Sequence, residues 1–315
     1  MGKSLKDLVL NQSNTIDIRD CYVQTGIEDI LGELDQELVG LEDVKGRLRE
    51  ISSVLLFDRI REIQELSSLN TSLHMAFTGR PGTGKTSVAA KIALVLRSLG
   101  YLTKGHITNV TREDLVGQYV GHTAPKTKEN LQRAQGGILF IDEAHHLYKP
   151  DNERDYGSEA IELLLQVMEN QRDDLILIFA GGKEKIDGFF NSNPGVSSRI
   201  GNHVDFKDYN VDELAEICKF LLHNENRYKF TDEALDILVF YLGQLVNFPA
   251  FANARTVKVL LNQLLSYQAI RVEDTLVQTG KLDYDSLVTI QGQDFNYFSG
   301  DDFVNIIGSE DIQLH

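Results

Sequence analysis

The chain has 315 residues, of which 42% are hydrophobic and 25% charged, a composition typical of globular proteins and a length sufficient for two domains. Its formal net charge of −16 argues against a broad nucleic-acid-binding surface, which would require clustered Lys and Arg. Cys21 and Cys218 are far apart and form no C-x-x-C pattern, so neither a disulfide framework nor a zinc site of that type is indicated.

The chain begins without the apolar segment of a secretory signal peptide, and no later stretch approaches 18 consecutive apolar residues. We therefore expect a soluble protein that is not secreted and has no membrane partner. Residues 1–37 are acidic and weakly patterned, which predicts an N-terminal linker segment. Helical spacing follows from Val44 to Leu56.

The segment 38–209 alternates short apolar runs with helical periodicity, which predicts an α/β domain with a parallel sheet covered by helices. The expected strands are 73–77, 106–110, 137–141, 175–180 and 204–206.

Helical patterns alone follow, and they predict a small all-helical domain at 210–297. Asn210 is a good N-cap residue, with Glu213 in the capping-box position. Further helices should begin near Thr231 and near Asn253. The acidic segment 298–315 is expected to be a loosely attached tail.

Residues 79–86 read Gly-Arg-Pro-Gly-Thr-Gly-Lys-Thr, a complete G-x-x-x-x-G-K-[ST] phosphate-binding loop. The loop follows the apolar run 73–77 and precedes a helical pattern at 87–93, so the glycines fall in a strand-to-helix turn. This context separates the motif from an ordinary glycine-rich turn, which is the alternative interpretation.

The residue types of the loop suit a polyphosphate. Its glycines let the main chain curl so that backbone amides point at an anion. Lys85 is placed to neutralise β and γ oxygens, and Thr86 offers a hydroxyl to a magnesium ion. The predicted nucleotide-binding residues of the loop are Gly79, Pro81, Gly82, Thr83, Gly84, Lys85, Thr86 and Ser87.

Two carboxylates, Asp142 and Glu143, end the apolar run 138–141. We expect this strand to lie beside the phosphate loop, with Asp142 holding magnesium through water and Glu143 polarising the water that attacks the γ-phosphate. Hydrolysis is thus favoured over simple binding. The alternative is an acidic strand end that opens a helix, where the macrodipole favours Asp and Glu.

The phosphate loop, the Asp-Glu strand and the following helical domain together resemble an AAA+ ATPase, over residues 35–297. The resemblance implies a parallel-sheet P-loop domain followed by a small all-helical lid. It also implies that Val39 and Gly40 contact adenine, that Arg199 is an arginine finger acting on a neighbour's nucleotide, and that Arg255 is the sensor-2 arginine. Guanidinium groups suit such phosphate contacts.

The chain departs from the AAA+ pattern at the end of the fourth strand, where the family usually has a polar sensor-1 residue. Here the sequence reads Phe-Ala-Gly-Gly-Lys over 179–183. Either a water or Lys183 substitutes, or this chain hydrolyses ATP poorly and relies on a more active partner subunit.

Tyr119, Val120 and Gly121 follow the second strand and fit the aromatic-apolar-glycine pattern of AAA+ pore loops. An aromatic side chain can grip an extended peptide with little entropy to lose, and glycine lets the loop move. The alternative is a tyrosine that packs a local turn.

This loop and the segments 143–157 and 165–172 closely resemble the CbbX family of red-type Rubisco activases. The resemblance implies a hexamer, homomeric or mixed with a paralogous subunit, that draws the C-terminal tail of the Rubisco large subunit into its pore and releases inhibitory sugar phosphates. It further implies ATP and Mg²⁺ as cofactors, ribulose 1,5-bisphosphate as allosteric ligand, and a plastid stroma or bacterial cytoplasm as location.

His145 and His146 stand where that family has tyrosines, which suggests one of several paralogous subunits. We do not expect them to bind a metal as a pair, since adjacent helical positions face different directions.

Other classes of protein remain as alternatives. A generic remodeller of another substrate fits the same motifs. A DNA-translocating or clamp-loading motor is disfavoured by the net charge of −16 and by Tyr119. A nucleotide switch or small-molecule kinase would use the same phosphate loop, but it has no evident need for Arg199.

Overall fold

The computed structural model describes Val9, residues 17–66, 72–149, 155–170, 174–223 and 228–298, and Ile306. The predicted acidic tail at 298–315, apart from Phe298 and Ile306, lies outside this set, as do residues 150–154 and 171–172 of the segments that resemble CbbX. The chain forms two compact units, one comprising 1–79 and 84–206 and the other 80–83 and 207–315. Among the described helices, none is both long enough and apolar enough to cross a membrane.

The first unit is built on a five-stranded parallel sheet of order β2-β3-β4-β1-β5. Its strands lie within two residues of the predicted ranges, which confirms the predicted sheet. The innermost strands are buried along their whole length, as expected for a sheet covered on both faces. The strands are β1 (Met75–Gly79), β2 (Ile107–Val110), β3 (Ile138–Ile141), β4 (Ile176–Gly181) and β5 (Asn202–Phe206).

The strand order corrects one expectation. β3, which carries the two carboxylates at its end, is not beside β1, because β4 lies between them. The strands are parallel, so their carboxyl ends still share one edge, with β1 and β3 roughly 10 Å apart at two strand spacings.

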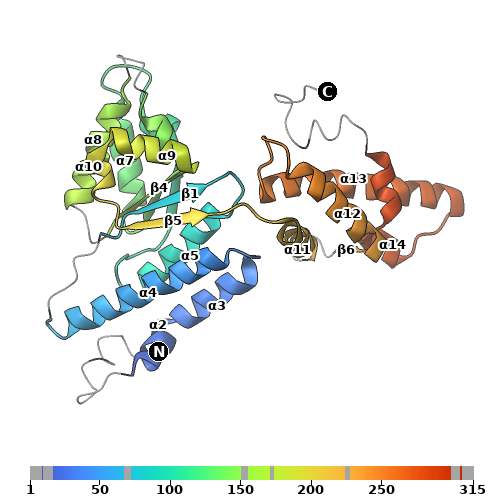
Figure 1. Ribbon diagram of the computed structural model, residues 1–315, viewed down its shortest axis with the longest axis horizontal. Helices are drawn as coiled ribbons and strands as arrows, with labels where there is room; N and C mark the ends of the chain where they lie inside the picture. The colour runs from blue at the N-terminus through green and yellow to red at the C-terminus, as the bar shows by residue number, and fades with distance from the viewer. Residues whose placement is uncertain are drawn as a thin grey trace. The chain divides into compact units, whose positions relative to one another are not determined.

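Helices cover both faces of this sheet, with α4 and α5 on one side and α7 to α10 on the other (Figure 1). A buried cluster that includes Leu131, Leu164 and Phe179 joins the second set of helices to the strands. The helices are α4 (Glu42–Ile63), α5 (Lys85–Ser98), α6 (Arg112–Leu115), α7 (Thr123–Ala134), α8 (Gly157–Asn170), α9 (Lys183–Ser192) and α10 (Pro194–Ser197), with a 3-10 helix η1 (Ala144–Leu147).

Two further helices, α2 (Ile18–Thr25) and α3 (Ile27–Glu37), occupy the segment that the sequence predicted to be a linker. Gly26, at φ 70°, ends the first and begins the second. Ile27, Leu31 and Leu34 repeat at i, i+4 and i+7 and are buried, so a short apolar stripe holds α3 in place. Such short helices in an acidic segment give a weak sequence signal.

The second unit contains the predicted helices. Asn210 caps the first helix, and Glu213 completes the capping box by accepting from the Asn210 amide at 2.8 Å. Thr231 caps the second. The elements are α11 (Val211–Leu221), α12 (Asp232–Leu245), α13 (Ala254–Thr279), α14 (Tyr284–Val288) and a 3-10 helix η3 (Gly292–Tyr297).

This unit is not purely helical, because β6 (Lys229–Phe230) and β7 (Thr289–Ile290) pair in parallel. Two-residue strands carry no detectable alternation, so the sequence could not predict them. Arg271, on α13, is buried and bonds both Asp294 and the carbonyl of Thr289, which fixes this ladder against the long helix.

Candidate nucleotide-binding and hydrolysis site

The phosphate loop has the strand-loop-helix arrangement that the sequence predicted. Gly79 ends β1 at φ 151°, where a Cβ atom would lie 2.4 Å from the carbonyl oxygen of Phe206. Gly84, at φ 92°, immediately precedes α5. The Lys85 ammonium is buried and donates to the Gly79 carbonyl at 2.8 Å. The lysine therefore folds back over the loop, at the amino end of a helix whose free amides favour an anion.

The tip of the loop, residues 80–83, belongs to the second unit. There Arg80 donates to Asp208 at 3.1 Å and to the carbonyl oxygens of Pro249 and Phe251 at 2.7 and 2.8 Å. Gly82 has φ 75°, and a Cβ atom on it would lie 2.0 Å from the Ala252 carbonyl oxygen. The tip thus has no room for a side chain at Gly82.

Asn253 is a buried residue of the second unit that sequence analysis considered only as a helix start. It has a positive φ of 49°, an uncommon conformation for a residue with a side chain. Its amide donates to Asp208 at 2.9 Å and to the Pro81 carbonyl at 3.4 Å, and its oxygen accepts from the Tyr209 amide at 3.0 Å. Asn253 therefore fixes the loop tip and the start of α13 together.

Arg255, the predicted sensor-2 arginine, is exposed in the first turn of α13. Its neighbour Ala254 donates its amide to the Gly82 carbonyl at 3.1 Å. The predicted adenine-contacting pair, Val39 and Gly40, lies half-buried in the turn between α3 and α4.

Asp142 and Glu143 directly follow β3, at the same sheet edge as the phosphate loop. Asp142 donates its amide to Val110 on β2 at 2.8 Å, and its carboxylate accepts from the Glu143 amide at 3.1 Å. Glu143 has φ 47°, a left-handed conformation that costs energy in a non-glycine residue. The strained turn projects Glu143 away from the strand direction. Thr86, which is exposed at the start of α5, and Asp142 offer oxygen ligands of the kind that Mg²⁺ prefers.

His145 occupies the space beside the end of β4, where a sensor-1 side chain is missing. A Cβ atom on Gly181 would lie 3.3 Å from the His145 Nδ1 atom. Lys183, considered as a substitute for sensor-1, instead pairs with Asp205 on β5 at 2.8 Å. Burial, followed by the charges of His146 and Lys185, lowers the pKa of His145 to about 4, so its ring is neutral at pH 7.

Arg199, the predicted arginine finger, follows α10 and is already paired within this chain. Its guanidinium forms an ion pair with Glu169 on α8 and donates to the Gly195 carbonyl at 2.6 Å. Sequence analysis did not predict Glu169 as the partner of Arg199. Any contact of Arg199 with a neighbouring subunit therefore has to replace this ion pair.

Comparison with known proteins places these residues in a family. The model for AAA, the "ATPase family associated with various cellular activities", matches residues 75–206, and the AAA lid domain model matches 210–303. A "Protein CfxQ homolog" of Cyanidium caldarium is 56% identical over 279 residues, covering 89% of this chain and 96% of the relative. "Protein CbbX" of Cereibacter sphaeroides is 52% identical, covering 89% of this chain and 90% of the relative. The chain belongs to the CbbX/CfxQ family of AAA ATPases.

A further CbbX/CfxQ relative, from Cyanidioschyzon merolae, bears the name "Ribulose bisphosphate carboxylase/oxygenase activase, chloroplastic". It is 54% identical over 286 residues, covering 91% of this chain and 97% of the relative. The solved FIGL-1 AAA domain in complex with ADP matches with a TM-score of 0.56 and 18% identity, covering 91% of this chain and 92% of that chain. At that identity the likeness concerns the fold alone. A CbbX/CfxQ chain with an AAA module is an ATPase that binds nucleotide with Mg²⁺.

The CbbX/CfxQ chain presents Tyr119 and Val120 at the tip of the loop between α6 and α7. Their exposed fractions are 67% and 80%. Gly121 has φ 79°, and a Cβ atom there would have nothing within 4 Å. Tyr119 contacts only the edge of the His122 ring among the described aromatic residues, at 5.5 Å between centroids. A tyrosine that packed a local turn would be buried, so the exposure favours a binding loop.

Buried polar side chains of α7 hold the base of this loop. Thr123 accepts from the Gly117 amide at 3.0 Å, and Thr127 donates to the Leu115 carbonyl at 2.8 Å. Asn130 donates to the Asp114 carbonyl at 2.8 Å. The ends of the loop are therefore held by hydrogen bonds, whereas its tip is exposed.

Arg112 connects the start of that loop region to the segment that follows Glu143. From α6 its guanidinium donates to the carbonyl oxygens of His146 and Leu147 at 2.7 and 3.2 Å, and it forms an ion pair with Asp155. The sequence did not single out Arg112, because a lone arginine in a short helix has no motif.

Proposed function

We propose that this chain uses ATP hydrolysis to remodel inhibited red-type Rubisco. The observation that carries the proposal is the 54% identity, over almost the whole length of both chains, to a relative named as a chloroplastic Rubisco activase. Plastid stroma is the proposed location, with bacterial cytoplasm as the alternative supported by the CbbX relative of Cereibacter sphaeroides.

The proposed hydrolytic roles follow from the chemistry of the loop and of the strand end. Lys85 neutralises phosphate charge, and the exposed hydroxyl of Thr86 together with Asp142 holds Mg²⁺, which offsets the charge of the phosphates. Glu143 accepts a proton from, or orients, the attacking water. Arg199 acts as the arginine finger: it leaves its ion pair with Glu169 and contacts the phosphates bound in the site of a neighbouring subunit.

The proposed remodelling role falls to the Tyr119 loop. Its exposed aromatic and apolar tip can hold an extended peptide without sequence-specific hydrogen bonds, and its fixed base transmits force to α7. We propose that the peptide is the C-terminal tail of the Rubisco large subunit, and that pulling on it in the pore of a homo- or hetero-hexamer releases inhibitory sugar phosphates.

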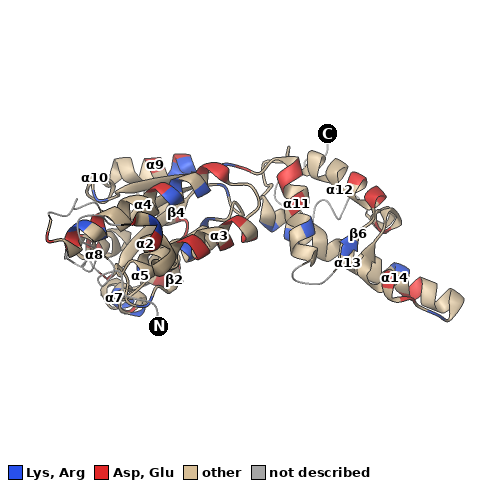
Figure 2. Cartoon of the chain, turned by 90° about the horizontal axis from the view of Figure 1, so that it is seen from below, with Lys and Arg blue, Asp and Glu red and all other residues tan. Residues whose placement is uncertain are grey.

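Charge distribution supports a protein substrate over a nucleic acid. Figure 2 shows Lys and Arg interspersed with Asp and Glu along the helices of both units, and the net charge of the chain is −16. Ribulose 1,5-bisphosphate is proposed as the allosteric ligand, and Arg255 as the residue through which the lid responds to the γ-phosphate.

A coupled carboxylation assay tests the proposal. Red-type Rubisco inhibited by a bound sugar phosphate is incubated with the chain, ATP and ribulose 1,5-bisphosphate, and the recovery of carboxylation is followed. We expect ATP-dependent recovery with intact Rubisco and none with Rubisco whose large-subunit tail has been removed. An active ATPase that rescues neither form would be a remodeller of another substrate.

A further inference from the structure

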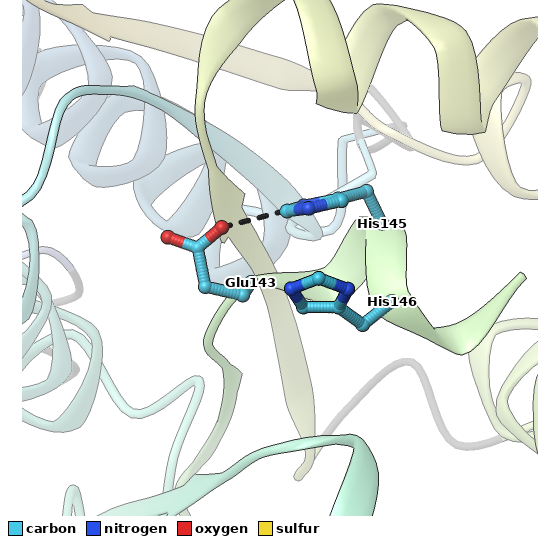
Figure 3. Close-up of side chains that lie close together, drawn as sticks. All are labelled: Glu143, His145 and His146. Carbon is cyan, nitrogen blue, oxygen red and sulfur yellow. Dashed lines mark ion pairs between the residues drawn. The ribbon is translucent and has the colours of Figure 1, made fainter. Parts of the chain in front are cut away.

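Glu143, His145 and His146 form a compact group of potential ligands just after β3. One ligand atom from each residue lies within 4.8 Å of the other two. Figure 3 shows both imidazoles projecting from the 3-10 helix η1 toward the Glu143 carboxylate. The family resemblance gives no role to these histidines.

The histidines were expected to diverge, and the structure contradicts this. Their rings lie 4.1 Å apart between centroids, tilted by 38°. The left-handed conformation of Glu143 and the tight 3-10 turn bring its carboxylate and both rings to one side.

The first reason to consider a metal ion is that, in the described part of the chain, the ring nitrogens of His145 lack hydrogen-bond partners. Its side chain is 12% exposed, and neither ring nitrogen has a hydrogen-bond partner among the described residues. A buried polar group without a partner costs free energy.

The second reason is the spacing of the ligand atoms. His145 Nδ1 lies 3.4 Å from Glu143 Oε2, longer than a good hydrogen bond. Two ligands that are bonded to Zn²⁺ at their usual distances, and subtend the tetrahedral angle, lie about 3.3 Å apart. The pair therefore already has the separation of one edge of a zinc coordination tetrahedron.

His146 supplies a third ligand. Its ring is exposed, so a small rotation about its side-chain bonds meets little resistance. One carboxylate and two imidazoles suit Zn²⁺, Co²⁺ or Ni²⁺, whereas Mg²⁺ prefers oxygen ligands alone. Lys185, whose charge reaches His145, opposes a cation at this position, and the Glu143 carboxylate offsets it.

We propose that Glu143, His145 and His146 bind a zinc-like divalent transition-metal ion. With the ion bound, the Glu143 carboxylate is engaged as a ligand and cannot accept a proton from water, so ATP hydrolysis stops. This inhibition rests on the proposed catalytic role of Glu143, whereas metal binding itself does not.

Binding is measured on the tag-free, nucleotide-free full chain by titration with Co²⁺, followed by visible absorption, and by calorimetry with Zn²⁺. We expect one ion per chain and an intense, tetrahedral-type Co²⁺ spectrum. His146→Ala should weaken Zn²⁺ binding at least tenfold, because a ligand is lost. His223→Ala, which removes an exposed histidine of the second unit, should leave it unchanged.

Lys185→Ala gives a test that does not remove a ligand. Loss of a nearby positive charge should tighten Zn²⁺ binding, whereas unspecific binding elsewhere would not respond. Equal Zn²⁺ affinity of wild type and His146→Ala, or a weak octahedral Co²⁺ spectrum in the wild type, would overturn the proposal.

The ATPase measurement separates this proposal from the catalytic role of Glu143. Zn²⁺ should inhibit ATP hydrolysis by the wild type. At the same Zn²⁺ concentrations, His146→Ala should hydrolyse ATP as fast as it does without Zn²⁺. If Zn²⁺ binds at the site by the criteria above and hydrolysis continues, the metal site stands and the proposed role of Glu143 is wrong.

Discussion

Replacing Arg112 by methionine should destabilise the first unit by about 3 kcal/mol. The change leaves the Asp155 carboxylate, which is 9% exposed, without its cation, and frees the carbonyl oxygens of His146 and Leu147. Removing one partner of a buried pair typically costs 3–5 kcal/mol because the other charge remains buried. Arg112 is itself 18% exposed, which places the expected loss at the lower end.

Urea unfolding followed by circular dichroism measures this loss, since the chain contains no tryptophan for fluorescence. The matched double variant, Arg112→Met with Asp155→Leu, should recover most of the stability, because no unpaired charge stays buried. Arg112→Lys should be intermediate, since an ammonium keeps the charge but cannot bond two carbonyls and a carboxylate in one plane. A loss below about 1 kcal/mol in Arg112→Met would mean that the contact behaves as a surface pair, and would refute the reasoning.

Four further outcomes are expected. Lys85→Ala should abolish nucleotide binding, measured with a fluorescent ATP analogue, because Lys85 is the buried cation of the described phosphate loop and would neutralise phosphate charge. Glu143→Gln should bind ATP and assemble normally but show no turnover; hydrolysis at the wild-type rate would remove Glu143 from catalysis. Arg199→Ala should lower ATPase only through neighbouring subunits, so activity in mixed rings should depend on the mutant fraction. Glu169→Ala, which releases Arg199 from its ion pair, should keep or raise that activity, and a loss there would assign the pair a role in assembly instead.

Local patterns were sufficient to predict the strands, the phosphate loop and the helix starts of the second unit. Each depends on residues close together in sequence, such as the capping box of Asn210 and Glu213. The left-handed glycines of the phosphate loop belong to the same class, because their spacing in the motif reflects the backbone that they allow.

Contacts between distant segments could not be predicted in this way. The position of β4 between β1 and β3 depends on how the chain crosses over between strands, and the sequence motifs do not indicate the order of the strands in the sheet. Arg112 and Glu169 look like ordinary surface charges until the fold brings Asp155 and Arg199 to them.

The histidines illustrate a different limit. His145 and His146 were expected to point apart, a rule derived from regular α-helices. In the structure the two rings lie side by side on the 3-10 helix η1, a short element directly after the left-handed Glu143 that the sequence analysis did not predict. Strained backbone conformations cluster at functional sites, and Glu143 has one at the sheet edge that carries the phosphate loop.

The central claim is that the Tyr119 loop converts ATP hydrolysis into force on a Rubisco tail. Its most direct test measures ATPase and Rubisco recovery in the same reaction for wild type, Tyr119→Phe and Tyr119→Ala. We expect all three to hydrolyse ATP, Tyr119→Phe to rescue Rubisco, and Tyr119→Ala to fail, because the exposed tyrosine makes no described hydrogen bond that phenylalanine would lose. Normal rescue by Tyr119→Ala with active hydrolysis would contradict the account.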